Sequence, residues 1–168
     1  ETALYAANNG SSTTGGLYSY GTIGSTERAI GTIGSANTSF GGSFAHGALF
    51  QNTSGSNITV MNVSYALEQW RNGGNTTPNV VTFWYKISPT IITNLNPGNN
   101  TGWTPVTALD AASPVNTATA SAINGNNAPN RVVLTNIGIP ALSIPNGSYI
   151  MLKWSDPDHT GNDHGLAI

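Results

Sequence analysis

Turn-forming residues interrupt this chain so often that it has no room for a long helix. Of its 168 residues, 20 are glycine and nine are proline, and asparagine is frequent between them. No window of about a dozen residues repeats apolar side chains with the 3.6-residue period of an amphipathic helix. Short runs of β-branched and aromatic residues fill the spaces between the turns, as in strands. The pattern therefore predicts an all-β protein.

Four runs carry the strongest strand signals. They cover residues 58–70, 80–87, 131–137 and 149–154. Weaker signals cover residues 17–20, 29–33, 42–51 and 103–109. Met61 breaks the alternation near Val60, so we expect a bulge or a change of face there.

The turns between these runs have a physical basis, because Gly and Asn accept positive φ and Pro presets φ. They lie at residues 72–75, 96–99, 124–127 and 145–147. This spacing of strands and turns predicts an antiparallel β-sandwich. The length suits one domain, and no linker divides the chain, so we expect a single domain over residues 1–168.

Charge is scarce in this chain. Only 7% of its residues are charged, against about 25% in an ordinary soluble domain, and the net charge is −2. No basic patch is available for a phosphate backbone, which argues against a nucleic-acid partner. No run of apolar residues is long enough for a membrane-spanning helix, and no signal peptide begins at Glu1. Cysteine is absent, which excludes disulfides and thiol chemistry.

The scarcity of charge makes one acidic segment conspicuous. Three of the four aspartates, Asp156, Asp158 and Asp163, fall within eight residues near the C-terminus. Carboxylates this close repel one another unless a cation neutralises them. The expected cation is calcium, held by these three side chains together with Thr160. Further ligands would be backbone carbonyls or a distant carboxylate such as Glu27 or Glu68.

Of three other interpretations of the segment, an EF-hand, Asx-turns and a zinc site, the last two remain open. The spacing of Asp156, Asp158 and Thr160, followed by Gly161, matches the start of an EF-hand loop, but position 12 is Ala167 instead of glutamate. An EF-hand is therefore not expected. The aspartates could instead form Asx-turns in a solvated loop. His159 and His164 raise the alternative of zinc, although their spacing does not match a standard ligand pair.

Aromatic residues beside turns are candidates for ligand contact. Trp70 and Arg71 precede the turn at residues 72–75, and Trp103 follows a glycine-containing loop. Indole rings stack on sugar faces, and planar polar groups bind hydroxyls. In the alternative interpretation, Trp70 closes one end of the core and Arg28 and Arg71 pair with carboxylates. We expect Trp84 and Trp154 to be buried in their strands.

No catalytic constellation is recognisable. The chain lacks a cysteine nucleophile and a Gly-x-Ser-x-Gly elbow. Outside the acidic segment and the N-terminus only Glu27, Glu68 and Asp110 carry carboxylates, and none lies in a glycosidase-like pair. We therefore expect a protein that is not an enzyme.

Several segments together resemble a known group of modules. They are residues 18–21, 25–31, 63–74, 103–106 and 109–110, and the final segment Leu-Lys-Trp-Ser-Asp-Pro-Asp-His-Thr-Gly-Asn-Asp-His-Gly-Leu-Ala-Ile at 152–168. The set resembles bacterial secreted modules found beside extracellular nucleases, lamin-tail domains and sorting signals. Their final motif reads roughly Trp-x-Asp-x-Asp-x-x-Gly-x-Asp-His-Gly-Leu-Ala-Ile and usually continues Asp-Asp-Phe.

The resemblance implies a secreted, jelly-roll-like sandwich similar to carbohydrate-binding modules. The chain stops at Ile168, before the usual Asp-Asp-Phe. The expectation is therefore that the last strand is cut short or lies outside this sequence, and that a further aspartate ligand lies there too.

Two functions are expected from these features. The first is a non-catalytic binding module, secreted or on the cell surface, that holds structural calcium and recognises a polysaccharide or cell-surface glycan through Trp70, Arg71 and Trp103. The second is a structural subunit of an extracellular filament, sheath or adhesin, in which copies of the chain pair through strand edges or a donated strand. The neutral, hydroxyl-rich composition fits both.

Overall fold

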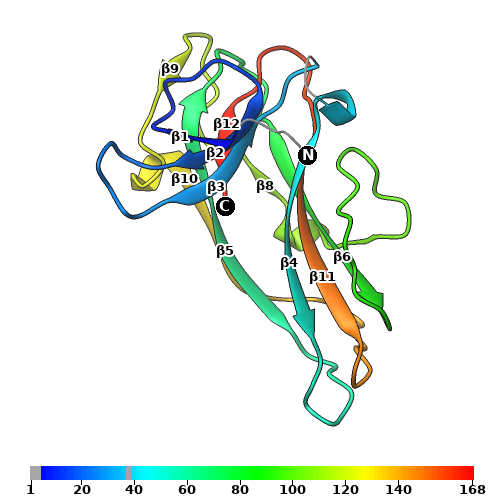
Figure 1. Cartoon of the computed structure of the whole chain (residues 1–168). Helices are drawn as coiled ribbons and strands as arrows, with labels where there is room; N and C mark the ends of the chain where they lie inside the picture. The colour runs from blue at the N-terminus through cyan, green and yellow to red at the C-terminus, as the bar shows by residue number, and fades with distance from the viewer. Residues whose placement is uncertain (1–4, 37–38) are drawn as a thin grey trace.

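The computed structural model describes residues 5–36 and 39–168. Its strands form two sheets packed against each other, which confirms the predicted all-β sandwich (Figure 1). The jelly-roll connectivity remains a prediction. In the described part of the chain, no helix has the length and apolar character needed to cross a membrane. The described helical elements are short 3-10 turns: η1 (Ser39–Gly42), η2 (Thr107–Leu109) and η3 (Ala128–Asn130).

The larger sheet has the strand order β1-β2-β3-β12-β5-β10, and β9 also pairs with β5. Its strands are β1 (Tyr5–Asn8), β2 (Gly16–Tyr20), β3 (Ala29–Ile33), β5 (Asn62–Asn72), β9 (Ser121–Ala122), β10 (Arg131–Gly138) and β12 (Gly165–Ala167). The pairing of β1 with β2 is parallel, and the other pairings are antiparallel. The short strand β12 lies between β3 and β5 and pairs with both.

The smaller sheet has the strand order β4-β11-β6-β7, and β8 also pairs with β6. Its strands are β4 (Phe44–Gln51), β6 (Val80–Ser88), β7 (Thr104–Pro105), β8 (Ala111–Ala112) and β11 (Tyr149–Asp156). All described pairings in this sheet are antiparallel. The central strand β11 pairs with β4 on one side and with β6 on the other.

The main core lies between the two sheets. Its buried members include Leu67 of β5, Leu166 of β12, Phe83 of β6 and Trp154 of β11. The Trp154 ring meets Phe83 edge-on, with centroids 5.2 Å apart. Alternation along the strands supplies these inward side chains, because successive residues of a strand point to opposite faces. Trp154 is buried as predicted, whereas Trp84, on the opposite face of its sheet, is only half-buried.

Two smaller apolar clusters cover the outer faces. On the larger sheet, Tyr18, Tyr20 and Trp70 pack together. On the smaller sheet, Trp103, from the segment that joins β6 to β7, packs with Met151 of β11. Lys153 lies buried in this second cluster. Its Nζ donates to the carbonyls of Leu95 (2.9 Å) and Asn99 (3.1 Å) and lies 4.3 Å from the centroid of the Trp103 ring.

The strand predictions differ from the structure at several ends. The run at 58–70 begins as a strand only at Asn62, and Ile58 forms an isolated bridge with Ile144. The irregularity expected near Val60 therefore lies just before the first residue of the strand. Within β5 itself, the pairing with β10 contains a register shift between Leu134 and Ile137. Most of the run at 103–109 forms β7 and η2, because Pro105 and a 3-10 turn interrupt the ladder.

Candidate functional site

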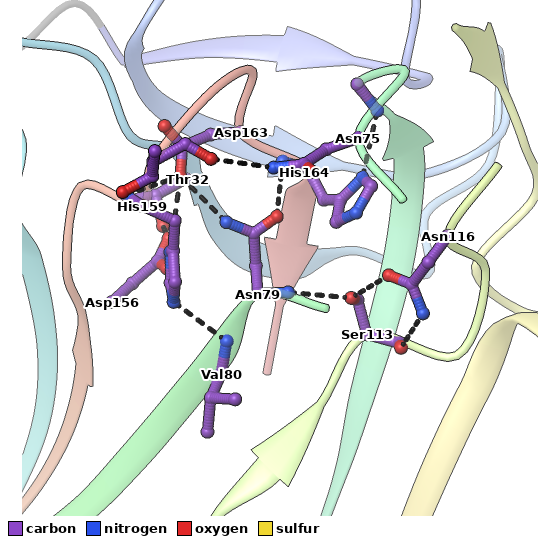
Figure 2. Close-up of polar contacts among 12 residues, drawn as sticks. Thr32, Asn75, Asn79, Val80, Ser113, Asn116, Asp156, His159, Asp163 and His164 are labelled. Atoms are coloured by element: carbon purple, nitrogen blue, oxygen red, sulfur yellow. Dashed lines mark hydrogen bonds and ion pairs between the residues drawn. The ribbon is translucent and has the colours of Figure 1, made fainter. Parts of the chain in front are cut away.

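The acidic segment connects the two sheets. We call residues 156–164 the acidic loop: it leaves β11 in the smaller sheet and enters β12 in the larger one. Figure 1 shows this crossing as the orange-to-red part of the chain. Because the loop crosses one end of the sandwich, its side chains reach groups that are far away in sequence (Figure 2).

Asp156 is buried where the sheets meet. Thr32 of β3 donates its hydroxyl proton to Asp156 Oδ2 at 2.5 Å, across 124 positions of sequence. Burial raises the pKa of Asp156 to about 7, although the hydrogen bond from Thr32 lowers it; the negative charges of Asp163 and Asp158 add to the increase. This carboxyl group is therefore poised between its protonated and ionised forms near neutral pH.

Asp163 accepts a set of N–H groups. Its Oδ1 atom accepts hydrogen bonds from Asn79 Nδ2 (3.0 Å), from the His159 backbone N–H (3.1 Å) and from His159 Nδ1 (3.3 Å). The carboxylate lies against Gly34, where an added Cβ would come within 3.0 Å of Asp163 Cγ. A side chain at that position would push the Asp163 carboxylate away by a few tenths of an ångström. The glycine at 34 is thus part of the cradle that holds Asp163.

His159 is a structural link within the loop. The Val80 backbone N–H donates to its Nε2 at 2.9 Å, so the ring proton lies on Nδ1, which faces Asp163 (Figure 2). Burial lowers the pKa of His159, but hydrogen bonding and charge from Asp163 and Asp156 outweigh burial and raise it. A second proton would have to occupy Nε2 and displace the Val80 N–H, so the neutral form fits this geometry.

His164 is also engaged by the backbone. Its Nδ1 accepts the Gly73 N–H at 2.9 Å, and its own N–H donates to Asn79 Oδ1 at 3.3 Å. Burial lowers the pKa of His164. Asn79 therefore fixes the C-terminal end of the loop, since its amide reaches both Asp163 and His164. His159 Nε2 and His164 Nδ1 already accept backbone N–H groups, and the described residues place no three or more His, Asp or Glu side chains together to hold a metal ion, so the zinc alternative has no support from the geometry.

Asp158 is the exposed member of the trio. Burial raises its pKa, and hydrogen bonding and charge from nearby Asp163 add to the increase. The segment before β4 packs against it, because a Cβ at Gly42 would lie 2.7 Å from Asp158 Cβ. In the described residues, no Lys or Arg side chain lies within ion-pair distance of the three aspartates.

The structure gathers only part of the predicted calcium ligand set. Among residues 5–36 and 39–168, no group of three or more His, Asp or Glu side chains is placed so as to hold a metal ion. Asp158 and Asp163 are neighbours, Asp156 is bonded to Thr32, and Thr160 is exposed with its carbonyl accepting Asn75 Nδ2 at 3.0 Å. The donors are all oxygens, as calcium requires. Calcium binding remains a prediction.

A polar cavity of about 550 Å³ opens beside the acidic loop. Asp158, His159 and Asp163 contribute to one part of its lining. Ile33, Gly34, Ser35 and Ala36 contribute a second part, and Arg71 and Gly73 a third. The cavity is large enough for a small saccharide unit and offers it both carboxylates and a guanidinium group.

The aromatic residues predicted to contact ligand lie elsewhere. Trp70 is 1% exposed and Trp103 is 7% exposed, each within an outer-face cluster. Neither ring presents a free face for a sugar, so stacking on them is not supported by this structure. The alternative interpretation of Trp70 as a packing residue fits its position. Arg71 alone of the three lines the cavity.

The distant carboxylates considered as metal ligands also have other roles. Glu68 is buried, accepts the Trp70 Nε1 hydrogen at 3.0 Å and lies 3.6 Å from Arg131. Glu27 accepts a hydrogen bond from Asn126. Arg28, expected to pair with a carboxylate, instead donates to Ser19.

Thr32 and Asn79 hold the acidic loop but carry no sequence signal for this role. Thr32 lies in a weakly predicted strand, and Asn79 follows Pro78 before a strong one. Asn79 is itself fixed by reciprocal hydrogen bonds with Ser113, whose hydroxyl donates to Asn116.

A comparison of the chain with protein-family models, curated proteins and solved structures finds no match.

The pKa of Asp156 leads to a prediction for the metal-free protein. The folded-state pKa lies above the unfolded value near 3.8, so the folded state binds the extra proton between these pH values. In chelator, the stability of the wild type relative to Asp156→Asn should therefore fall as pH rises from about 4 to about 7, by on the order of a few kcal/mol. Urea unfolding of both proteins measures this difference.

The comparison with Asp156→Asn removes other titrations common to both proteins. Burial lowers the pKa of His46 to about 4, which gives stability the opposite pH dependence between about 4 and 6.5. This contribution cancels in the difference. A difference that stays constant between pH 4 and 8 would show that Asp156 does not take up a proton on folding.

Proposed function

We propose that this chain is a non-catalytic, calcium-dependent module that binds an extracellular polysaccharide in the cavity beside the acidic loop. The observation that carries the proposal is the shared space itself, where two carboxylates and a guanidinium line one polar cavity. Saccharide hydroxyls are bound by convergent polar groups of this kind. The proposed setting is the cell exterior, secreted or surface-attached, as the composition suggests.

Calcium would be held by Asp158 and Asp163, with backbone carbonyls of the acidic loop as further ligands. When bound, the ion would neutralise the clustered negative charge and order the loop. Extracellular modules bind calcium with dissociation constants of roughly 10⁻⁴–10⁻³ M. A site with one exposed carboxylate and one fixed by N–H donors suits that weak class.

Two histidines of the acidic loop support the non-catalytic part of the proposal. His159 Nε2 and His164 Nδ1 both accept backbone N–H groups. A general base needs a free lone pair within reach of the proton that it removes. Neither of these nitrogens offers one.

Retention on insoluble polysaccharides tests the proposal. We expect the wild type to be retained in calcium and released by chelator, and Asp158→Asn to be retained more weakly. Glu27→Gln is the matched control, because it removes one exposed negative charge outside the cavity and should behave as the wild type. Failure to bind any polysaccharide in calcium, or equal retention in chelator, would contradict the proposal.

A second candidate, self-assembly into a surface filament, is favoured by open strand edges. Among the described strands, β4 pairs only with β11, and residues 62–66 of β5 pair only with β10. Phe50 of β4 is opposite core residue Ile150, and hence on the inner face, yet it is 50% exposed. Sedimentation and electron microscopy of wild type and Phe50→Ser distinguish the candidates. Fibres lost in the variant would support assembly, and a monomer at high concentration would contradict it.

A further inference from the structure

Arg71 differs from the other basic side chains in its surroundings. The chain has only five lysines and arginines. Arg131 pairs with Glu68, Arg28 donates to Ser19, and Lys153 donates to two backbone carbonyls. Lys86 lies on β6, outside the cavity lining. Arg71 is the one of the five that lines the polar cavity.

The charges lining this cavity are held apart. Arg71 Nη1 donates to the Gly10 carbonyl at 3.1 Å, while Asp163 is held by Asn79 and His159. The described residues contain no ion pair between Arg71 and either Asp158 or Asp163. Arg71 and the two carboxylates therefore line the same cavity without forming an ion pair across it. Arg71 and Asp163 are each held by hydrogen bonds to other groups. A ligand that fills the space gains most if its own groups complement both charges.

A guanidinium selects planar anions. Its fixed N–H groups match a carboxylate in two parallel hydrogen bonds, and a neutral hydroxyl cannot use that geometry as fully. The carboxylate-lined part of the cavity, in contrast, suits hydroxyl groups or a cation. A sugar ring that carries one carboxylate and several hydroxyls provides both kinds of group.

We infer that the polysaccharide bound in this cavity is acidic and contains uronic acid units, with the sugar carboxylate on Arg71 and ring hydroxyls toward Asp158 and Asp163. This inference rests on the proposed function and adds the ligand class. It predicts selection by charge at a single position of the sugar.

Calorimetric titration in calcium tests the inference with three matched ligands: a galacturonic acid disaccharide, its methyl ester and the neutral galactose disaccharide. A titration of each ligand into calcium without protein corrects for direct binding of the ion. The wild type should bind the acid at least about tenfold more tightly than the ester, because a charge-assisted hydrogen bond contributes about 1.5–3 kcal/mol and about 1.4 kcal/mol is a factor of ten. The neutral disaccharide should behave as the ester.

Variants of Arg71 test whether this residue causes the preference for the acid over the ester. Arg71→Gln should bind acid and ester equally, and Arg71→Lys should restore part of the preference. Lys86→Gln removes the same charge outside the cavity and should keep the full preference. Thermal melting of each variant checks folding, and the acid-to-ester ratio in the wild type is independent of any variant.

The outcomes distinguish failure of the uronic acid inference from failure of the proposed function. Equal binding of acid and ester by the wild type would overturn the inference and leave polysaccharide binding intact. Binding of none of these ligands, together with no retention on any polysaccharide, would overturn the proposed function itself. Tighter binding of a sulfated disaccharide, or of a free amino acid, would overturn the assignment to uronic acid.

Discussion

Replacing Trp70 with alanine is expected to destabilise the protein by about 3–5 kcal/mol, the range for a large aromatic residue removed from a core. Trp70 stacks on Tyr20, with ring centroids 6.1 Å apart and planes 8° from parallel. A Cβ at Gly125 would lie 2.5 Å from Trp70 Nε1, which shows how closely that segment covers the indole. Alanine would leave a cavity and would deprive the buried Glu68 carboxylate of its N–H donor.

Urea unfolding at equilibrium measures this effect. Trp70→Phe keeps most of the ring but loses the N–H donor, so it should destabilise the protein less than Trp70→Ala does. The difference in the free energy of unfolding between the two variants measures the cost of the cavity. Val60→Ala is the surface control, since Val60 is exposed and such changes usually lie within about 0.5 kcal/mol of zero. A Trp70→Ala protein of unchanged stability that no longer bound polysaccharide would restore Trp70 to the role of a sugar contact.

The position of Trp70 shows what alternation can and cannot decide. Leu67 points into the core, so period-two alternation places Trp70, three positions later, on the outer face of the same strand. The sequence therefore predicts on which face of the strand Trp70 lies. Its burial depends on Tyr20 and on the segment of Gly125, which packs against the indole from a distant part of the chain. The sequence left the burial of Trp70 open, because this cover is a tertiary feature.

Strands with strong local signals were predictable. Val80–Ser88 and Tyr149–Asp156 are rich in β-branched and aromatic residues, and both form long strands close to the predicted runs. Gly165–Ala167 has no such signal, because three residues are too few to show a period. Its place between β3 and β5 depends on the hydrogen-bonding groups that those strands offer. The parallel pairing of Tyr5–Asn8 with β2 is non-local in the same sense.

The acidic loop was predictable as a cluster, and its surroundings were not. Charge scarcity singled out Asp156, Asp158 and Asp163 without any structural information. The groups that hold them, Thr32 and Asn79, are 124 and 84 residues away from their aspartate partners. One hydroxyl and one amide among many similar residues give no pattern to find. Arg71 was identified for its neighbour Trp70, yet its relevance comes from the cavity.

The electrostatics of the loop explain why its occupation matters for stability. Burial and the neighbouring carboxylates raise the pKa of Asp156 to about 7, so the loop without a cation holds charge that its surroundings disfavour. A divalent ion would remove that repulsion at every pH at which the carboxylates are ionised. Stabilisation by calcium should therefore be larger at pH 8 than at pH 5.

Thermal melting with calcium and with chelator tests the central claim, that the acidic loop takes up a divalent cation, most directly. Calcium at about 100 times its dissociation constant should add about 2.7 kcal/mol if the unfolded chain does not bind it. For a chain of this length the melting temperature should rise by about 5–10 °C. Asp163→Asn should abolish the rise, and Glu27→Gln should retain it. Identical melting of the wild type in calcium and in chelator, at pH 8 and saturating ion, would contradict the account.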